Sequence, residues 1–241
     1  MFKELIGKYD KLPAHLTVYS GAGGEDAKDW ADMVFRMYFR YAQKRGWKTF
    51  ITHDREMEIS GDFAYGVLKK EAGVHRLVRI SPFSAKKLRH TSFVLVEVVP
   101  ILPDVEHKQL LIPDKDLRID TFRSSGPGGQ NVNKLETAVR ITHLPTGVVS
   151  ACQTERSQLQ NKEKAMALLK SKLLNLMVQN QKNELSDLRV KVKPEWGSQI
   201  RSYVLHPYKL VKDHRNGVES SQPDKVLDGD LDKFVEAELQ L

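Results

Sequence analysis

Residues 123–172 read RSSGPGGQNVNKLETAVRITHLPTGVVSACQTERSQLQNKEKAMALLKSK. The stretch begins with a glycine-rich loop, Ser124–Asn133, which follows a predicted strand over Leu117–Phe122. Two more strands are expected around the turn Pro145–Gly147, and a long helix is expected over Ser157–Leu188. Four apolar side chains recur at helical spacing on one side of this helix: Met166, Leu169, Leu173 and Leu176. The stretch therefore predicts an α/β domain that ends in a long helix.

The glycine-rich loop carries the residues best suited to chemistry. Gly128 and Gly129 can adopt backbone angles closed to residues with a Cβ, so a ligand can approach them closely. Gln130 adds a backbone N–H and a neutral amide that donates and accepts hydrogen bonds. Four basic side chains around the loop are suited to bind phosphates: Arg123, Lys134, Arg140 and Arg156. From the residues alone, a mobile surface loop stays open as an alternative.

The rest of the chain predicts a second, β-rich lobe. Leu16–Tyr19 resembles a strand, and residues 25–45 have apolar side chains at the spacing of an amphipathic helix that ends at Gly46. The sequence from 48 to 103 favours strands. We expect an α+β fold of two lobes. The predicted domains are residues 1–115 as the first part of the β-rich lobe, 116–193 as the loop-bearing domain, and 194–241 as a segment that packs back on the first lobe.

A second glycine-rich segment, Gly21–Gly24, lies between a strand and a helix. It is followed neither by the Lys-Ser/Thr of a phosphate-binding loop nor by dinucleotide-binding spacing. Acidic residues at the start of the helix oppose its dipole and would repel phosphate. We interpret this segment as a structural corner.

The composition limits the class of protein. The chain of 241 residues has a net charge of +7, and residues 116–193 hold 13 Lys and Arg against 7 Asp and Glu, which favours an anionic partner. The single cysteine, Cys152, excludes an intrachain disulfide and a cysteine-based metal site, and we interpret it as a buried strand residue. No signal peptide or membrane span is evident, so we expect a soluble, cytoplasmic protein without cofactor or metal; a mature organellar form is the alternative.

With Gly-Gly-Gln in this setting, residues 123–172 resemble the catalytic domain of bacterial class I peptide chain release factors. The resemblance continues through WGSQIRSYVL (196–205), HPYKLVKDHR (206–215) and VLDGDLDKF (226–234). It implies a codon-recognition lobe next to a GGQ catalytic domain. The amino-terminal helical domain of the family has no counterpart before Met1, so we expect a chain that lacks it, and this leaves the interaction with the recycling GTPase open.

The resemblance also implies how a stop codon is recognised. Ser81-Pro82-Phe83 matches the tripeptide of the UGA- and UAA-reading (type 2) branch, and a serine hydroxyl can both donate to and accept from a purine. The family assigns His90 to stacking between codon bases and Thr91 to the third base. It also places the tip of the first helix, here Gly24 and Glu25, near the first base.

In the family, the Gln130 backbone N–H stabilises developing charge at the peptidyl-tRNA ester, and its side chain orients water; the amide is N5-methylated by a methyltransferase. The expected partners are therefore the ribosome with its rRNA, the mRNA stop codon, the P-site peptidyl-tRNA and this methyltransferase. Two alternatives remain. A codon-independent ribosome-rescue hydrolase would carry a long basic tail, whereas residues 224–241 hold two Lys and six Asp and Glu. A non-catalytic RNA-binding relative would usually lose Gly-Gly-Gln.

Overall fold

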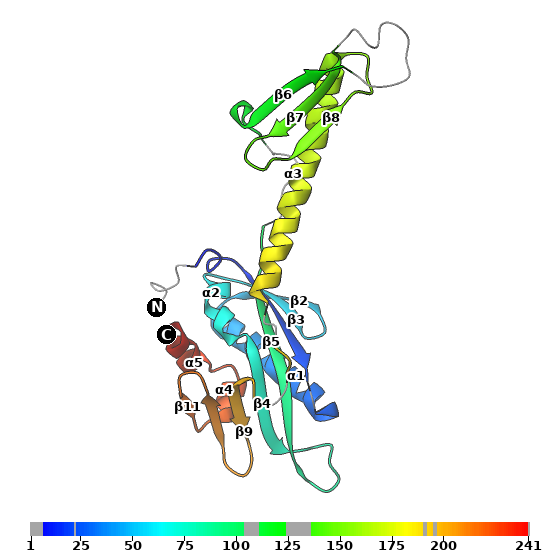
Figure 1. Ribbon diagram of the computed structural model, residues 1–241. Coiled ribbons are helices and arrows are strands. Elements are labelled where there is room, and N and C mark those ends of the chain that lie inside the picture. Colours follow the sequence, from blue (N-terminus) through cyan, green and yellow to red (C-terminus); the bar gives the residue numbers. More distant parts are fainter. Residues whose placement is uncertain are drawn as a thin grey trace. The chain divides into compact units, whose positions relative to one another are not determined.

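The computed structural model describes residues 7–21, 23–103, 111–123, 136–189, 192–194 and 197–240 (Figure 1). Contacts divide the chain into two compact units, one formed by residues 1–102 with 185–241 and the other by residues 103–184. The second boundary falls within a long helix. The domain boundaries that we predict from the sequence, 115/116 and 193/194, lie farther along the chain and stay a prediction.

The first unit is built on an eight-stranded sheet in the order β11-β10-β9-β4-β5-β1-β3-β2. All neighbouring strands are antiparallel except β4 and β9, which run parallel with Val78 opposite Val204. The C-terminal segment therefore packs back on the first lobe, as expected. The strands are β1 (Ala14–Ser20), β2 (Lys48–His53), β3 (Glu56–Ser60), β4 (Gly73–Ile80), β5 (Arg89–Pro100), β9 (Gln199–Val204), β10 (Leu210–Asp213) and β11 (Glu219–Ser220).

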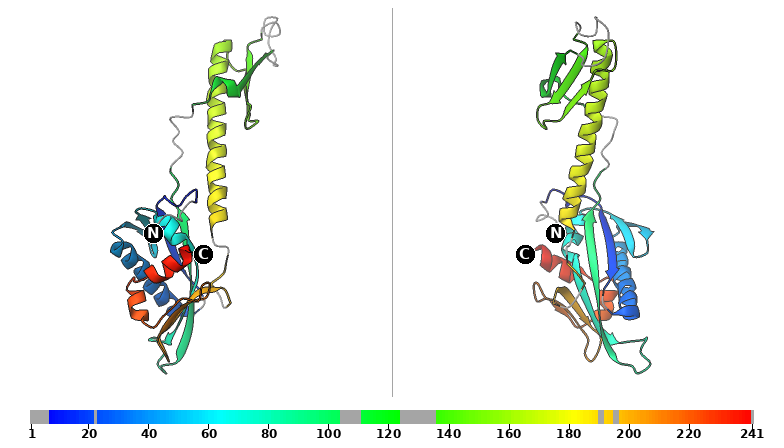
Figure 2. Two further views of the ribbon diagram at one scale, coloured as in Figure 1. Left: turned by 90° about the vertical axis from the view of Figure 1, so that its left-hand side faces the viewer. Right: turned by 45° about the vertical axis from the view of Figure 1, so that its right-hand side comes forward.

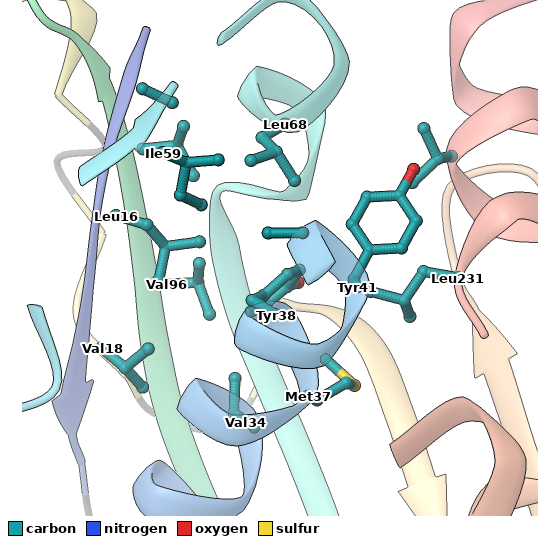
Figure 3. Close-up of a cluster of buried hydrophobic side chains, with 14 of the residues drawn as sticks. Leu16, Val18, Val34, Met37, Tyr38, Tyr41, Ile59, Leu68, Val96 and Leu231 are labelled. Atoms are coloured by element: carbon teal, nitrogen blue, oxygen red, sulfur yellow. The ribbon is translucent and has the colours of Figure 1, made fainter. Parts of the chain in front are cut away.

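Helix α1 (Gly24–Lys44) packs against one face of this sheet, and the C-terminal helices α4 (Pro223–Leu227) and α5 (Asp232–Leu239) lie on the same side (Figure 2). The predicted apolar side of α1 is confirmed, because each of its five members is at most 1% exposed: Trp30, Val34, Met37, Tyr38 and Tyr41. Figure 3 shows Val34, Met37, Tyr38 and Tyr41 between Leu16 and Val96 of the sheet and Leu231 before α5. Burial of such side chains contributes roughly 1.5–3 kcal/mol each.

Two short helices between β3 and β4 were not expected. They are α2 (Ala64–Leu68) and the 3-10 helix η1 (Lys69–Glu71). Five residues are too few to show helical periodicity, and all five residues of α2 are buried, so no polar side marks the helix in the sequence. Glu71 of η1 is fully buried and forms two hydrogen bonds, of 2.6 and 2.7 Å, with Arg201 of β9. This pair fastens the C-terminal segment to the amino-terminal part of the same unit.

The second unit has a three-stranded antiparallel sheet, β6-β7-β8, and the long helix α3 (Gln158–Leu188). Its strands, β6 (Leu117–Phe122), β7 (Ala138–His143) and β8 (Val149–Cys152), lie where the sequence predicts them, after the 3-10 helix η2 (Asp114–Asp116). Leu169 and Leu173 of α3 are buried against the sheet, and Met166 is partly buried. Leu176, the fourth residue of this row, is 38% exposed, because it lies beyond the part of α3 that this small sheet covers.

Among the described residues, no helix combines the length and the apolar composition needed to cross a membrane. Cys152 is buried in β8, as expected.

Candidate functional site

Ser81, the first residue of the Ser-Pro-Phe motif, is bonded to the first turn of α1. Its hydroxyl donates a hydrogen bond of 2.7 Å to Oδ2 of Asp26 and accepts one of 3.1 Å from the backbone N–H of Phe83. The residue is 2% exposed. Both functions of the hydroxyl are thus used within the protein, so direct contact between Ser81 and a base requires the 81–88 loop to change conformation.

Asp26 gathers three donors on one buried carboxylate. Besides Ser81, the Nδ1 atom of His90 lies 2.8 Å from Oδ2, and Nη2 of Arg79 lies 3.3 Å from Oδ1. Burial raises the pKa of Asp26, but the hydrogen bonds from Ser81, His90 and Arg79 outweigh burial and bring the pKa below its ordinary value. The carboxylate is therefore ionised at neutral pH, and it joins two of the candidate recognition residues, Ser81 and His90.

Arg79 and His90 both bind Asp26 from strands of the sheet. They are opposite each other on the antiparallel strands β4 and β5, and the next pair is Val78 with Thr91. Arg79 also forms a 2.5 Å ion pair with Asp29, one turn farther along α1. Two strands and the start of α1 are thereby connected through charged hydrogen bonds, which are stronger and more directional than neutral ones.

The exposed parts of this cluster are suited to contact a base. The His90 side chain is 43% exposed and is held through Nδ1, while Nε2 has no hydrogen-bond partner among the described residues. Phe83 is 57% exposed. Pro82 and Thr91 are exposed as well. A fixed imidazole and an exposed aromatic ring each offer stacking surface to unstacked bases.

The Gly21–Gly24 corner is structural where it is described; Ala22 lies outside the described residues. A Cβ on Gly23 would come within 3.2 Å of the Ser92 hydroxyl of β5, and the backbone of Gly23 has φ +135°. Gly24, at φ +59°, begins α1 in open space, and the exposed Glu25 pairs with Lys28 at 2.7 Å. The corner thus places the start of α1 beside β5, where Asp26 reaches Ser81 and His90.

The catalytic residues predicted in the second unit, Gly128, Gly129 and Gln130, lie outside the described residues, and so does Lys134. The two ends of the loop that contains them are described. Phe122, at the end of β6, pairs with Ala138, at the start of β7. The loop therefore leaves and re-enters the sheet at one point.

Side chains of α3 bind the returning end of this loop. Asn161 is fully buried; its amide donates 2.9 Å hydrogen bonds to the carbonyls of Thr137 and Glu155 and accepts one of 3.0 Å from the Glu155 N–H. Gln158 donates a 3.0 Å bond to the carbonyl of Glu136. Asn161 thus satisfies backbone groups that would otherwise be unpaired at the base of the loop.

The described basic residues near the loop are exposed, as phosphate binding requires. Arg123 is 3.7 Å from the carboxylate of Glu136, which flanks the other end of the loop. Arg140 lies with its guanidinium 5.2 Å from the centre of the Phe122 ring. Arg156 lies just before α3. Their assignment to phosphate contacts stays a prediction.

Two groups at the site were missed in the sequence, Asp26 with Arg79 and Asn161 with Gln158. The signal for Asn161 was present: it lies four residues before Ala165 on the buried side of α3, and a polar residue in such a row indicates a specific hydrogen-bonding role. Asp26 had no comparable signal, because an acidic residue in a first helical turn is also explained by the helix dipole.

Comparison with known proteins agrees with this geometry. Residues 2–96 match the PCRF domain and residues 105–215 match the RF-1 domain. Peptide chain release factor 2 of Thermotoga petrophila is 52% identical over 98% of this chain, and that of Clostridium perfringens is 50% identical over 98%. The solved structure of release factor 2 of Thermus thermophilus superposes with a TM-score of 0.56 at 46% identity; the match covers 98% of this chain and 70% of that one.

The two-unit α+β fold and the matched domains define a class I peptide chain release factor, and the chain belongs to this family. The relatives named above are all release factor 2, the type that the Ser-Pro-Phe motif indicates. The chain spans about 66% of the length of Thermotoga petrophila release factor 2.

Proposed function

We propose that this chain terminates translation by recognising UGA and UAA in the ribosomal A site and promoting hydrolysis of the peptidyl-tRNA ester by water. The observation that carries the proposal is the Asp26 cluster, which joins Ser81 and His90, 9 residues apart in sequence, in a chain whose relatives at about 50% identity are release factor 2. The position of this cluster at the Ser-Pro-Phe motif supports a role in codon recognition.

In this proposal the 81–88 loop has two conformations. One is that of the free protein, and the other forms when the codon is bound. Asp26 holds the Ser81 hydroxyl until a purine base offers a better partner, and it keeps the His90 ring oriented for stacking. Thr91, exposed next to His90, contacts the third base, and Gly24 and Glu25 lie toward the first. A hydroxyl that donates and accepts can bind either purine at the second position.

Hydrolysis is proposed to occur at Gly128, Gly129 and Gln130. The oxygen of water attacks the ester carbonyl carbon, the bond to the tRNA 3′ oxygen breaks, and the water proton passes to that oxygen. The backbone N–H of Gln130 stabilises the developing negative charge; an oriented donor of this kind contributes about 2.7–4 kcal/mol. The glycines allow close approach to the ester, and the Gln130 amide orients the water.

The partners belong to the same proposal. They are the ribosome with its rRNA, the mRNA stop codon and the P-site peptidyl-tRNA, together with a methyltransferase that modifies Gln130. Arg123, Arg140 and Arg156, all exposed, are suited to phosphate contacts around the loop.

A release assay tests the proposal. Ribosomes carrying peptidyl-tRNA in the P site are programmed with UGA, UAA, UAG, a sense codon or an empty A site, and peptide release by the chain is measured. We expect release at UGA and UAA alone. Release on the empty A site would identify a rescue hydrolase instead, and ribosome binding without release at any codon would identify a non-catalytic relative.

A further inference from the structure

We propose a second RNA-binding element in the loop between β9 and β10, residues 205–209, where the Tyr208 ring stacks on an unpaired base of ribosomal RNA beside the decoding site. The inference rests on the proposed function, since it concerns how the same lobe is seated on the ribosome. It assigns this role to Tyr208 from its position, its exposure and the charge around it.

The position of the loop follows from the one parallel pair of strands in the sheet. Because β9 runs parallel to β4, the two strands end at the same edge, and the N–H of Leu205 donates a 2.8 Å hydrogen bond to the carbonyl of Val78. The strand order β9-β4-β5 then sets loop 205–209 and loop 81–88 on either side of the end of β4. Figure 1 shows both loops at this end of the sheet, pointing apart.

The Tyr208 side chain makes no contact with the described residues that would explain an aromatic residue at this position by the stability of the fold. Its side chain is 59% exposed, and among the described residues its ring makes no aromatic contact and its hydroxyl no hydrogen bond. Tyr19, which is 44% exposed, does have a partner, since its hydroxyl lies 3.5 Å from Glu97. A free, exposed aromatic ring on a loop is the platform on which single-stranded bases stack, typically without a strong sequence preference.

The charge of the two loops matches RNA. Residues 80–92 and 205–210 contain no Asp or Glu, while the exposed basic side chains there are Lys86, Lys87, Arg89 and Lys209. Lys209 is paired with Asp224 at 2.6 Å, but both side chains are more than half exposed. Such a surface pair is weak and can exchange Asp224 for a phosphate.

Ribosomal RNA fits this loop better than the mRNA. His90 and Thr91 are on β5, which is two strand spacings from β9, or roughly 10 Å. The two loops diverge from that edge (Figure 1). A base on Tyr208 therefore lies beyond the bases that His90 and Thr91 contact, and we assign it to ribosomal RNA.

Tyr208→Ala and Tyr208→Phe test this assignment in the full chain. Affinity is measured for ribosomes with UGA in the A site, and small-subunit rRNA bases are probed chemically in the same complexes. We expect Tyr208→Ala to bind roughly five-fold or more weakly and to lose protection of one rRNA base, while Tyr208→Phe retains both, since it keeps the ring. Phe50→Ala, at an exposed aromatic on edge strand β2, is the matched control and should leave both unchanged.

Equal affinity of wild type and Tyr208→Ala, or an unchanged rRNA protection pattern, would overturn the inference. So would an affinity loss that disappears when the mRNA bases flanking the codon are made abasic, because the stacked base would then belong to the mRNA. Neither readout requires hydrolysis. A wild-type chain that binds through Tyr208 but releases no peptide would refute the proposed function and leave this inference standing.

Discussion

The hydroxyl of Ser81 donates a 2.7 Å hydrogen bond to Oδ2 of Asp26, a residue 55 positions earlier in the chain. The same oxygen lies 2.8 Å from Nδ1 of His90. One carboxylate on the first turn of α1 thereby fixes two residues to which the family resemblance assigns stop-codon recognition. The two proposed codon-recognition residues are thus connected through Asp26, and removal of Asp26 should affect both.

Asp26→Ala should lower the free energy of unfolding by about 1–3 kcal/mol, because it leaves the buried Ser81 hydroxyl without its acceptor and removes one of the two carboxylates that bind Arg79. Peptide release at UGA and UAA should fall at least ten-fold. Urea denaturation and the release assay measure the two effects. Glu25→Ala, one residue away and exposed, is the control for stability and should change it by less than about 0.5 kcal/mol. Equal stability of the two variants would contradict the role given to Asp26.

Asn161→Ala should slow peptide release while affinity for the ribosome stays the same. The substitution removes the amide that holds the carbonyl of Thr137, where the Gly-Gly-Gln loop rejoins β7, so the loop loses its fixed base. Single-turnover release and equilibrium binding separate the two quantities. Gln158→Ala, which removes only an exposed bond to the adjacent Glu136 carbonyl, should have a smaller effect. A matched loss of affinity in Asn161→Ala would show that the residue acts through folding alone.

Arg201→Met should destabilise the first unit by about 3–5 kcal/mol, because the buried Glu71 would lose both hydrogen bonds from Arg201 and the buried Asp213 would keep Arg215 alone as its basic partner. The Arg201 side chain is fully buried and also lies 4.5 Å from the centre of the Phe234 ring. Chemical denaturation measures the loss. Lys212→Met, at a half-exposed ion pair on the neighbouring strand, is the control, with an expected effect within 1 kcal/mol. A loss of stability within about 1 kcal/mol in Arg201→Met would refute the proposal that Arg201 connects the C-terminal segment to Glu71.

Stability should fall as the pH is lowered from 6.5 toward 4, and His75 should be a cause. Burial, together with the charge of Arg201, lowers the pKa of His75 from 6.5 to about 4. Below pH 6.5 the unfolded chain therefore binds a proton that the folded chain does not bind until about pH 4, which favours unfolding. Denaturation across this range should show a shallower pH dependence for His75→Gln than for wild type. Parallel curves would exclude His75 as the cause.

Much of the fold could be predicted from local patterns. The apolar spacing of α1, the strands at β6 and β8 and the helix over residues 158–188 follow from periodicity and turn residues, and these predictions are confirmed. The helix α2 could not be predicted, since its five buried residues have no polar side. The exposure of Leu176 depends on where the small sheet ends, which is a tertiary fact that helical spacing does not contain.

The candidate site shows the same division. Motif residues such as Ser81 and His90 are recognisable in the sequence, but the carboxylate that joins them is not. Asp26 is acidic and lies in the first turn of α1, like the exposed Glu25 before it, and only the packing of α1 against β5 decides which of the two is buried. Long-range pairing of this kind, like that of Glu71 with Arg201, requires the folded chain.

The central claim is that the Gln130 backbone N–H promotes hydrolysis of the peptidyl-tRNA ester at a stop codon. Gln130→Pro removes this N–H, whereas Gln130→Ala keeps it and removes only the side-chain amide. The decisive measurement is the single-turnover rate of peptide release at UGA, made with ribosome affinity determined in parallel. The account predicts that Gln130→Pro abolishes release, that Gln130→Ala retains measurable release, and that both variants bind ribosomes like wild type. Release by Gln130→Pro at the wild-type rate would contradict it.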